Sequence, residues 1–297
     1  MGFPSVCRLD SYISLRESRN EGLKVQRSPN MLRRGLGFRF LKHEVSRQSR
    51  TVLCKCEPAD FVERKSPCEV MKEIEQCYAL INNLGRGVVY LGSSRMGPDH
   101  VHYSKVFELG REIAKLLDCT SWSGVGPGLM DAATKGALDA RKPVGGFKIG
   151  KEAGEWTTSN YHPYLPAESY LTCRFFSARK HGLVDAAVRK TSSDRTAVVA
   201  LPGGIGTLDE MFEIMALIQL ERIGSDLPVP FLLMNYDSFY SKLLDFLDDC
   251  KHWGTVSQGE IESLWKVCDS NCQALEYLSE FYSLPQTRIS DVQKVVS

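Results

Sequence analysis

The 297-residue chain lacks any apolar run long enough to cross a bilayer. Its longest runs resemble PFLLM at 230–234, whereas a membrane-spanning helix needs about 20 apolar residues. Cysteine is too scattered for a disulfide framework, because ten residues are spread over the whole length. Neither close pair, Cys54 with Cys56 or Cys268 with Cys272, has partners at zinc-ligand spacing. The sequence therefore predicts no transmembrane helix and idle thiols in a reducing compartment.

Acidic side chains are scarce in residues 1–56, which hold twelve Lys or Arg against four Asp or Glu. The rest of the chain carries 25 basic and 32 acidic side chains, so a basic head precedes an acidic body. The head is rich in Ser and Arg, shows weak periodicity and has no continuous apolar stretch of the kind that secretory signals contain. This composition predicts a transit peptide that is disordered if retained, with the chloroplast as first destination and the mitochondrion or the cytosol as alternatives. A basic arm that contacts nucleic acid or membrane is the other interpretation of the head.

After a linker at 57–65, short apolar runs alternate with longer segments of helical periodicity up to residue 284. Such alternation is typical of right-handed βαβ crossovers and a parallel sheet. We expect one α/β domain over 66–284, a single doubly wound, Rossmann-like parallel sheet with helices on both faces. Two weaker elements are expected to close it before a tail at 285–297. The weakly periodic stretch 150–167 predicts a functional or mobile loop.

Three turns rich in Gly or Ser follow predicted strands, at the ends where ligands bind in this architecture. Glycine allows close approach of a ligand to the backbone, and phosphate fits the start of a helix. Three turns at equivalent positions favour a phosphorylated ligand over ordinary tight connections. The candidate phosphate-binding residues are Gly92, Ser93 and Ser94 in GSSRMG, Gly124, Gly126 and Gly128 in SGVGPG, and Gly203, Gly204, Gly206 and Thr207 in PGGIGT.

The glycine spacings argue against two common nucleotide folds. SGVGPG gives G-x-G-x-G rather than G-x-G-x-x-G, and no acid ends the next predicted strand to hold a ribose hydroxyl. The P-loop pattern G-x-x-x-x-G-K-[ST] is missing as well. We therefore expect neither NAD nor ATP, and predict no metal or redox cofactor.

Four polar side chains near these turns are candidates for chemistry. Thr207 is expected either as a helix N-cap or as a phosphate-facing hydroxyl, and Glu210 lies one turn further, where it can point back over a ligand. A simple capping acid is the alternative for Glu210. Arg179 can clamp a phosphate or stabilise developing charge, with Lys180 beside it. A solvated basic pair is the alternative for both.

Two further groups of residues are weaker candidates. His100 and His102 alternate, but no acid or Cys stands at metal-ligand spacing from them. The aromatic residues Trp156, Tyr161 and Tyr164 can either stack on a nucleobase or pack the loop that carries them.

Two motifs carry a resemblance to a known family. PGGIGTLDE matches P-G-G-x-G-T-x-x-E, and ARKHGL matches the R-K-x-x-[LM] that precedes it. Together they resemble the Lonely guy family, once labelled possible lysine decarboxylases, over about 87–240. The resemblance implies a phosphoribohydrolase that cleaves a nucleoside 5′-monophosphate into free base and ribose 5-phosphate. It also implies Arg179 and Glu210 as the catalytic pair, phosphate held by the glycine turns, and a homodimer with sites near the subunit interface.

Two departures from the family pattern concern the substrate. SGVGPGLMDAA is similar to the longer T-G-G-G-P-G-[IL]-M-E-A branch, with Val125 in place of the middle Gly, and a substrate-contacting Thr of the family is Ala216 here. The catalytic pair is intact. We expect a cytokinin riboside 5′-monophosphate as first substrate and an AMP-like nucleotide as second, with neither nucleic acid nor membrane as partner. A non-catalytic protein that binds a nucleotide or phosphorylated cofactor is the alternative.

Overall fold

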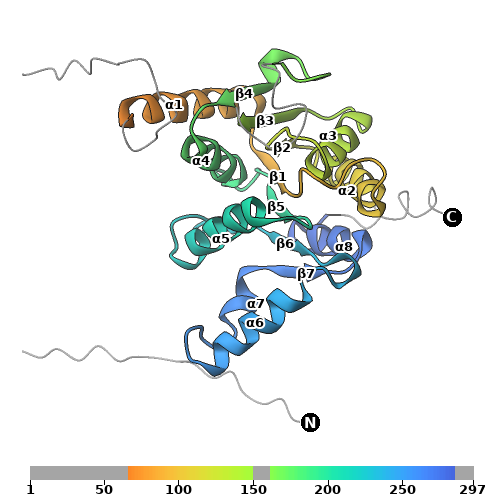
Figure 1. The fold of residues 1–297 in the computed structure, drawn as a ribbon, viewed down its shortest axis with the longest axis vertical. Helices are drawn as coiled ribbons and strands as arrows, with labels where there is room; N and C mark the ends of the chain where they lie inside the picture. Colours follow the sequence, from red (N-terminus) through yellow and green to blue (C-terminus); the bar gives the residue numbers. More distant parts are fainter. Residues whose placement is uncertain (1–65, 150–160, 285–297) are drawn as a thin grey trace, which may run out of the picture. The chain divides into compact units, whose positions relative to one another are not determined.

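The computed structural model describes residues 66–149 and 161–284, which form a single parallel sheet with helices on both faces. The strand order is β4-β3-β2-β1-β5-β6-β7 (Figure 1), so the chain starts in the middle, moves out to one edge, and returns beside β1 before moving to the other edge. The predicted doubly wound α/β sheet is confirmed. The predicted head, linker and tail lie outside the described residues. The strands are β1 (Gly87–Leu91), β2 (Thr120–Ser123), β3 (Val144–Ile149), β4 (Tyr170–Cys173), β5 (Ala197–Ala200), β6 (Phe231–Met234) and β7 (Lys266–Cys268).

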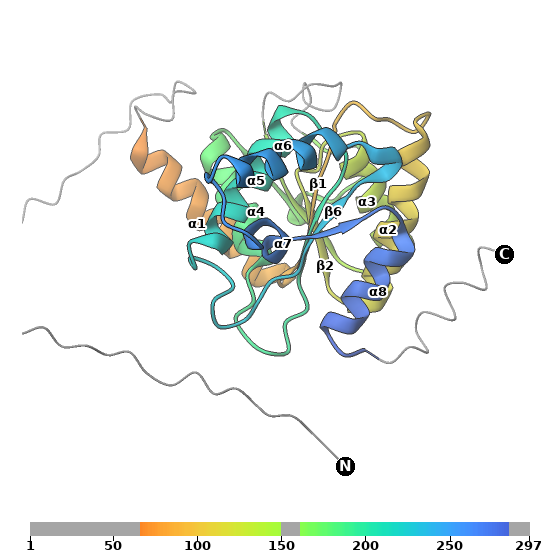
Figure 2. The same cartoon turned by 90° about the horizontal axis from the view of Figure 1, so that it is seen from below.

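Helices cover the two faces of the sheet unequally (Figure 2). Five helices, α1 and α4 to α7, contribute to the larger core cluster, whereas α2, α3 and α8 pack on the opposite face. No described helix is both long enough and apolar enough to cross a membrane. The helices are α1 (Pro67–Leu84), α2 (Val101–Leu117), α3 (Leu129–Asp139), α4 (Phe176–Ala187), α5 (Ile205–Gln219), α6 (Ser241–His252), α7 (Glu260–Leu264) and α8 (Asn271–Phe281), with single 3₁₀ turns at η3 (Ala167–Ser169) and η4 (Tyr236–Ser238).

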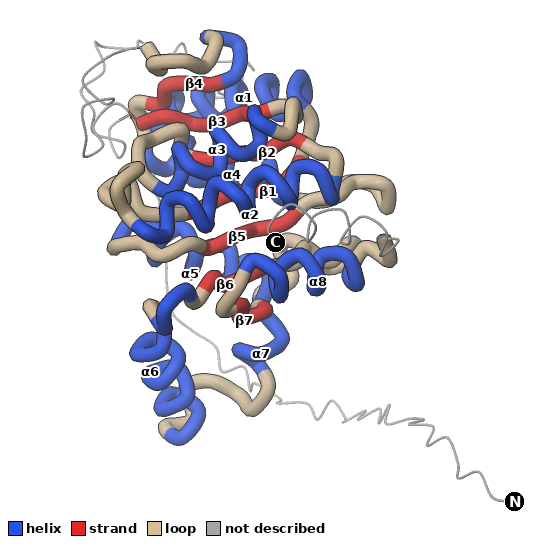
Figure 3. The backbone as a smooth tube through the Cα atoms, turned by 90° about the vertical axis from the view of Figure 1, so that its right-hand side faces the viewer, coloured by secondary structure: helices blue, strands red, loops and turns tan. Residues whose placement is uncertain are grey.

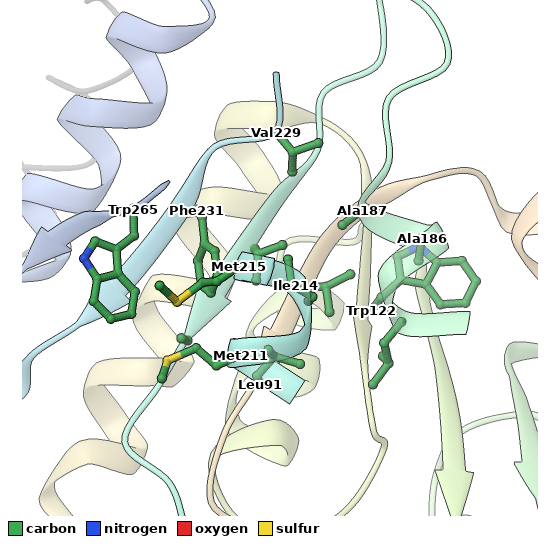
Figure 4. Packing of buried hydrophobic residues seen from close by; sticks show 14 of the residues in the cluster. Leu91, Trp122, Ala186, Ala187, Met211, Ile214, Met215, Val229, Phe231 and Trp265 are labelled. Atoms are coloured by element: carbon green, nitrogen blue, oxygen red, sulfur yellow. The ribbon is translucent and has the colours of Figure 1, made fainter. Parts of the chain in front are cut away.

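The central strands are buried on both faces. In β1, Val88 and Tyr90 join the core under α2, α3 and α8, whereas Val89 and Leu91 join the core under the other helices. Figure 4 shows Leu91 in this larger cluster, with Met211 of α5 beside it. Because both faces are covered, such strands read as continuous apolar runs rather than alternating ones, which is why the sequence indicates them clearly.

The end of the domain departs from the expectation. Three elements, α7, β7 and α8, close it rather than two. Strand β7 is only three residues long and pairs with β6 at the edge of the sheet, where Lys266 is exposed. A strand this short, with one exposed and one half-buried residue, gives neither an alternating nor a continuous apolar signal.

The topology brings the three glycine turns together. All strands are parallel, so their carboxyl ends lie at the same end of the sheet. The strand order runs without interruption from β4 to β7 (Figure 3). β1 lies between β2 and β5, with Tyr90 paired to Ser123 and Leu91 paired to Ala200. The order reverses at β1 and β5, and ligands bind outside such a switch point in open α/β sheets.

Candidate active site

Backbone hydrogen bonds join the three turns into one surface. The N–H of Ser93 donates to the carbonyl of Pro202 at 3.0 Å, and the carbonyl of Ser93 accepts the N–H of Leu129 at 2.9 Å. The turn after β1 therefore lies between the start of α3 and the end of β5. Gly128 has φ +76°, and a Cβ there would lie 2.3 Å from the Ser93 oxygen, so only glycine fits this contact. Gly92 and Ser94 belong to the same turn, half-buried or buried beside it.

The third turn leaves the start of α5 open. Gly204 is the N-cap and has no side-chain cap, and α5 begins at Ile205. Of the two roles expected for Thr207, the N-cap is therefore wrong, because the cap lies three residues earlier, where Gly204 adopts the extended conformation. The phosphate-facing hydroxyl stays a prediction. Within the described residues, the N–H groups of 205–207 have no acceptor, as is usual for the first turn of a helix. These groups and the helix dipole form an anion-binding start for α5.

Glycine has two different uses in this turn. A Cβ on Gly203 would lie 2.2 Å from Oγ1 of Thr207, so Gly203 makes room for the buried threonine. Gly204 and Gly206 meet nothing within 4 Å at the same test position, so their bare backbone faces open space. The hydroxyl of Tyr240 donates a hydrogen bond to the carbonyl of Leu201 at 2.6 Å, which holds the chain just before this turn.

Arg179 and Glu210 form a buried ion pair between the second and third turns. The Arg179 Nη1 atom lies 2.8 Å from Oε1 of Glu210, and both residues are almost fully buried, 4% and 6% exposed. The Arg179 Nε–H also donates to the Phe147 carbonyl of β3 at 3.1 Å. The structure thus rules out the alternative of a solvated arginine. The guanidinium stabilises the negative charge of this buried carboxylate.

Gly124 provides the space for this arginine. A Cβ at position 124 would lie 2.1 Å from Nη2 of Arg179 and 2.9 Å from Sδ of Met130. The guanidinium therefore packs directly on the bare backbone of the second turn. Gly126 is also buried in this turn. The sequence indicated a glycine that accommodates a ligand, whereas Gly124 accommodates a side chain of the site itself.

Among the described residues, the ion pairs of Lys180 are with α5 and not with the glycine turns. Its Nζ lies 3.0 Å from Asp209 Oδ2 and 3.0 Å from Glu213 Oε2 of α5. Burial opposes the charged form, but hydrogen bonds to these two carboxylates raise the pKa of Lys180 above its ordinary value. The lysine ties α4 to α5 and so keeps Arg179 and Glu210 facing each other. Its predicted phosphate contact stays a prediction.

Val125 adopts a backbone conformation that favours glycine. Its φ is +44°, which is unusual for a β-branched residue. The N–H of Val125 donates to Ser123 Oγ at 3.0 Å, and its side chain packs with Val144 and Leu165. Gly146 makes room for that side chain, since a Cβ there would lie 2.6 Å from Cγ2 of Val125. The valine at the position of the family glycine is thus accommodated by apolar packing with Val144 and Leu165.

A buried carboxylate anchors the end of the 150–167 stretch, of which residues 150–160 lie outside the described part. Asp131, in the first turn of α3, accepts hydrogen bonds from the hydroxyls of Tyr103 and Tyr164, the latter at 2.5 Å. Lys135 Nζ lies 2.9 Å from the same carboxylate. Tyr164 therefore packs the loop onto α3, in agreement with that alternative. Tyr161 is 75% exposed, and Trp156 lies outside the described residues.

His162 makes this anchor dependent on pH. Its Nδ1 accepts the N–H of Leu165 at 3.1 Å, and burial is the main cause that lowers its pKa from 6.5 to about 4. Because protonation favours the unfolded chain, the stability at this site is complete above pH 6.5 and falls as the pH drops towards 4. The free energy of unfolding of the wild type should fall between pH 7 and pH 5. We expect His162→Asn, which keeps an acceptor near Nδ1 but does not titrate, to reduce that fall by about 2 kcal/mol. Urea unfolding at both pH values measures this; identical pH dependence in the two proteins contradicts it.

The paired histidines at the start of α2 have a structural role. His100 caps the helix by accepting the His102 N–H at 3.1 Å. His102 Nε2 lies 2.7 Å from Oδ2 of Asp237, which follows β6. This contact links α2 to the other half of the sheet. Among the described residues no cluster of His, Cys, Asp or Glu could hold a metal ion.

Comparison with known proteins gives a consistent match. A family model described as possible lysine decarboxylase matches residues 130–278. The chain is 30% identical over 186 residues to a probable cytokinin riboside 5′-monophosphate phosphoribohydrolase of rice (Oryza sativa subsp. japonica), covering 61% of this chain and 66% of the relative. It is 30% identical over 178 residues to a cytokinin riboside 5′-monophosphate phosphoribohydrolase of Arabidopsis thaliana, covering 59% of this chain and 74% of the relative. The chain thus spans just under two thirds of the length of the rice relative.

Solved structures with a similar chain path have low sequence identity. The molybdenum cofactor carrier protein of Chlamydomonas reinhardtii is 17% identical, with a TM-score of 0.45 over 67% of this chain and 99% of that chain. The molybdenum cofactor binding protein of Rippkaea orientalis is 19% identical, with a TM-score of 0.41 over 66% of this chain and 94% of that chain.

Proposed function

Because this chain belongs to the Lonely guy family, whose model is described as possible lysine decarboxylase, we propose that it hydrolyses the N-glycosidic bond of a nucleoside 5′-monophosphate. The observation that carries the proposal is the buried Arg179–Glu210 pair beside the open start of α5. The turns supply N–H groups for a phosphate, and the pair supplies a fixed carboxylate next to it. A cytokinin riboside 5′-monophosphate is the first candidate substrate, with an AMP-like nucleotide second.

The proposed reaction needs no group beyond those in the chain. The 5′-phosphate binds the N–H groups of 205–207 and the turn after β1, which places C1′ of the ribose near Glu210. Water attacks C1′ as the bond from C1′ to the base nitrogen breaks, and the water proton passes to the base. The carboxylate of Glu210 stabilises the oxocarbenium-like charge and orients the water, as carboxylates do in glycosidases. Arg179 keeps that carboxylate in place. The products are a free base and ribose 5-phosphate.

The test uses the purified protein without added metal or redox cofactor. The full chain is incubated with isopentenyladenosine monophosphate and, separately, with AMP, and free base is measured by chromatography. We expect release of base together with ribose 5-phosphate. If neither nucleotide yields free base but both bind, the protein is a non-catalytic nucleotide-binding protein, the alternative suggested by Val125 and Ala216.

The resemblance also implies a homodimer, and two helices offer apolar surface for it. α5 exposes Ile205 and Phe212, seven residues apart and therefore on one face, and its C-cap residue Leu220 is exposed as well. α6 exposes Phe246, and its C-cap residue Trp253 is seven positions further, at 61% and 84% exposure. Helices with apolar residues on both their inner and outer faces are usually covered on both sides. We assign a second copy of this chain as the cover, near the site because Ile205 lies in the PGGIGT turn.

Breaking this surface should separate the subunits. We expect the wild-type chain to elute with twice the mass of one chain in light scattering, and Phe246→Glu to elute with the mass of one chain. An interface of this kind buries about 800 Å² per partner. The carboxylate of Phe246→Glu would lose its water there without gaining a partner charge, and this cost should prevent the dimer from forming. Met71→Glu is the matched control, because Met71 is 56% exposed on α1, outside this surface. A wild-type monomer, or a dimeric Phe246→Glu, contradicts the assignment.

The basic head supports delivery to a plastid. Its net charge of +8 and its Ser- and Arg-rich composition are typical of a segment that is recognised and removed, and every proposed site residue follows Gly87. Residues 1–60 fused to a fluorescent reporter test this in plant cells. Plastid fluorescence is the expected result, and diffuse cytosolic fluorescence contradicts it.

A further inference from the structure

We propose that Glu73 of α1 is a positioning residue for Arg179. This inference rests on the proposed function, because Arg179 is half of the pair to which hydrolysis is assigned. Helix α1 ends at Leu84 and so precedes the residues 130–278 that match the family model. The helix therefore brings a contribution to the site from outside the matched region.

Glu73 caps a helix other than its own. α4 begins at Phe176, and its N-cap residue, Phe175, has no side chain that can accept a hydrogen bond from the first turn. Oε2 of Glu73 accepts the N–H of Phe175 at 3.1 Å and the N–H of Arg174 at 3.0 Å. A carboxylate at this end also interacts favourably with the helix dipole. Glu73 thus holds the two residues at which the chain enters α4, Arg174 and the N-cap residue Phe175.

The cap acts directly on the turn that carries Arg179. The Arg179 N–H donates to the carbonyl of Phe175 at 3.2 Å, in the first turn of α4. The residue whose N–H is held by Glu73 therefore holds the backbone of Arg179. Oε1 of Glu73 also accepts from Nε of Arg174 at 2.8 Å, so both carboxylate oxygens are engaged, and the residue is 5% exposed.

α1 makes a second contact with α4 at the residue just before Arg179. Sγ of Cys77, one turn after Glu73, donates to the carbonyl of Ala178 at 3.6 Å. Gly182 allows this close approach, because a Cβ there would lie 3.1 Å from Cβ of Cys77. α1 therefore holds the chain at two places before the arginine, whose guanidinium must reach the Phe147 carbonyl and Glu210 at the same time.

Glu69 offers a matched control on the same helix. It lies one turn before Glu73 and pairs with Nη2 of Arg174 at 2.9 Å. Glu69 accepts from the Arg174 and Lys72 side chains, whereas the backbone N–H groups of Arg174 and Phe175 donate to Glu73. Both glutamates therefore neutralise the same arginine, and Glu73 is the one that holds the backbone at the start of α4. Comparing Glu73→Gln with Glu69→Gln separates loss of the cap from loss of a surface charge.

The experiment measures hydrolysis and the state of Arg179 in the full chain. We expect Glu73→Gln to lower kcat about tenfold with KM within threefold, since a small displacement of a catalytic group costs rate more than binding. Glu69→Gln should stay within twofold for both. In spectra of arginine-labelled protein, the Nε–H signal of Arg179, identified by its loss in Arg179→Lys, should shift or exchange faster in Glu73→Gln alone.

The spectra keep this inference separate from the proposed function. If the wild type releases no base, the proposed function fails, while the Arg179 signal still decides whether Glu73 positions the arginine. An Arg179 signal in Glu73→Gln identical to that of the wild type overturns the inference. An equal loss of kcat in Glu73→Gln and Glu69→Gln also overturns it, because the effect would then come from charge alone.

Discussion

Glu210→Gln should lower kcat for base release at least 100-fold while nucleotide affinity stays within about threefold of the wild type. The amide keeps the size of the side chain and one oxygen near Nη1 of Arg179, now 2.8 Å from the carboxylate. It loses the negative charge that the proposed transition state requires at C1′. The phosphate contacts lie in the turns and are unchanged. Steady-state kinetics and calorimetric titration with the nucleotide measure the two quantities.

The control and the double variant sharpen this prediction. Glu213→Gln changes the next acid along α5, which pairs with Lys180 at 3.0 Å while Asp209 remains as a second partner, so kcat should stay within about threefold. Arg179→Gln combined with Glu210→Gln should be no slower than either single variant, because the two residues act as one unit. A Glu210→Gln variant with wild-type kcat would remove the carboxylate from the mechanism.

The sequence was most informative where a signal depends on local chain properties. Buried strands such as β1 and β5 appear as continuous apolar runs because helices cover both faces of the sheet. The turns after them are visible because glycine is required at close approaches, as at Gly128. Arg179 and Glu210 were found through the two motifs, and the structure adds that they contact each other in a buried pair.

Features that depend on contacts between distant segments were not visible in the sequence. Asp131 appeared as an ordinary acid in the first turn of a helix, although Tyr103 and Tyr164 come from separate elements to bind it. One of the two roles expected for Thr207, the N-cap of α5, was misplaced, because threonine and glycine are about equally good caps and nothing local shows that Gly204 takes this position. Glu73 had no signal at all, since an acid on an amphipathic helix is normally exposed.

Gly124→Ala should lower kcat about 100-fold and also lower the stability of the protein. The added Cβ would lie 2.1 Å from Nη2 of Arg179, so the guanidinium has to leave its place opposite Glu210. The conflicting atoms are the ends of the Arg179 and Met130 side chains, so the backbone can keep its path, but moving the guanidinium weakens the buried ion pair with Glu210 and thereby lowers stability. A catalytic group displaced by about 1 Å can lose a factor of about 100 in rate. Kinetics and thermal unfolding of the same preparation measure both effects.

Gly204→Ala distinguishes displacement of a side chain from obstruction of the ligand. A Cβ at 204 meets no atom within 4 Å in the structure, so any loss must come from the bound nucleotide. We expect KM to rise about tenfold with a smaller change in kcat, because phosphate contacts are made equally in the ground state and the transition state. Gly97→Ala, which also meets nothing within 4 Å and lies at the end of GSSRMG, after the candidate phosphate-binding residues 92–94, should leave both constants unchanged.

The outcome for Gly124→Ala decides the role of the ion pair. A wild-type kcat in Gly124→Ala would show that Arg179 does not need the position it occupies, and this would contradict the role assigned to the Arg179–Glu210 pair.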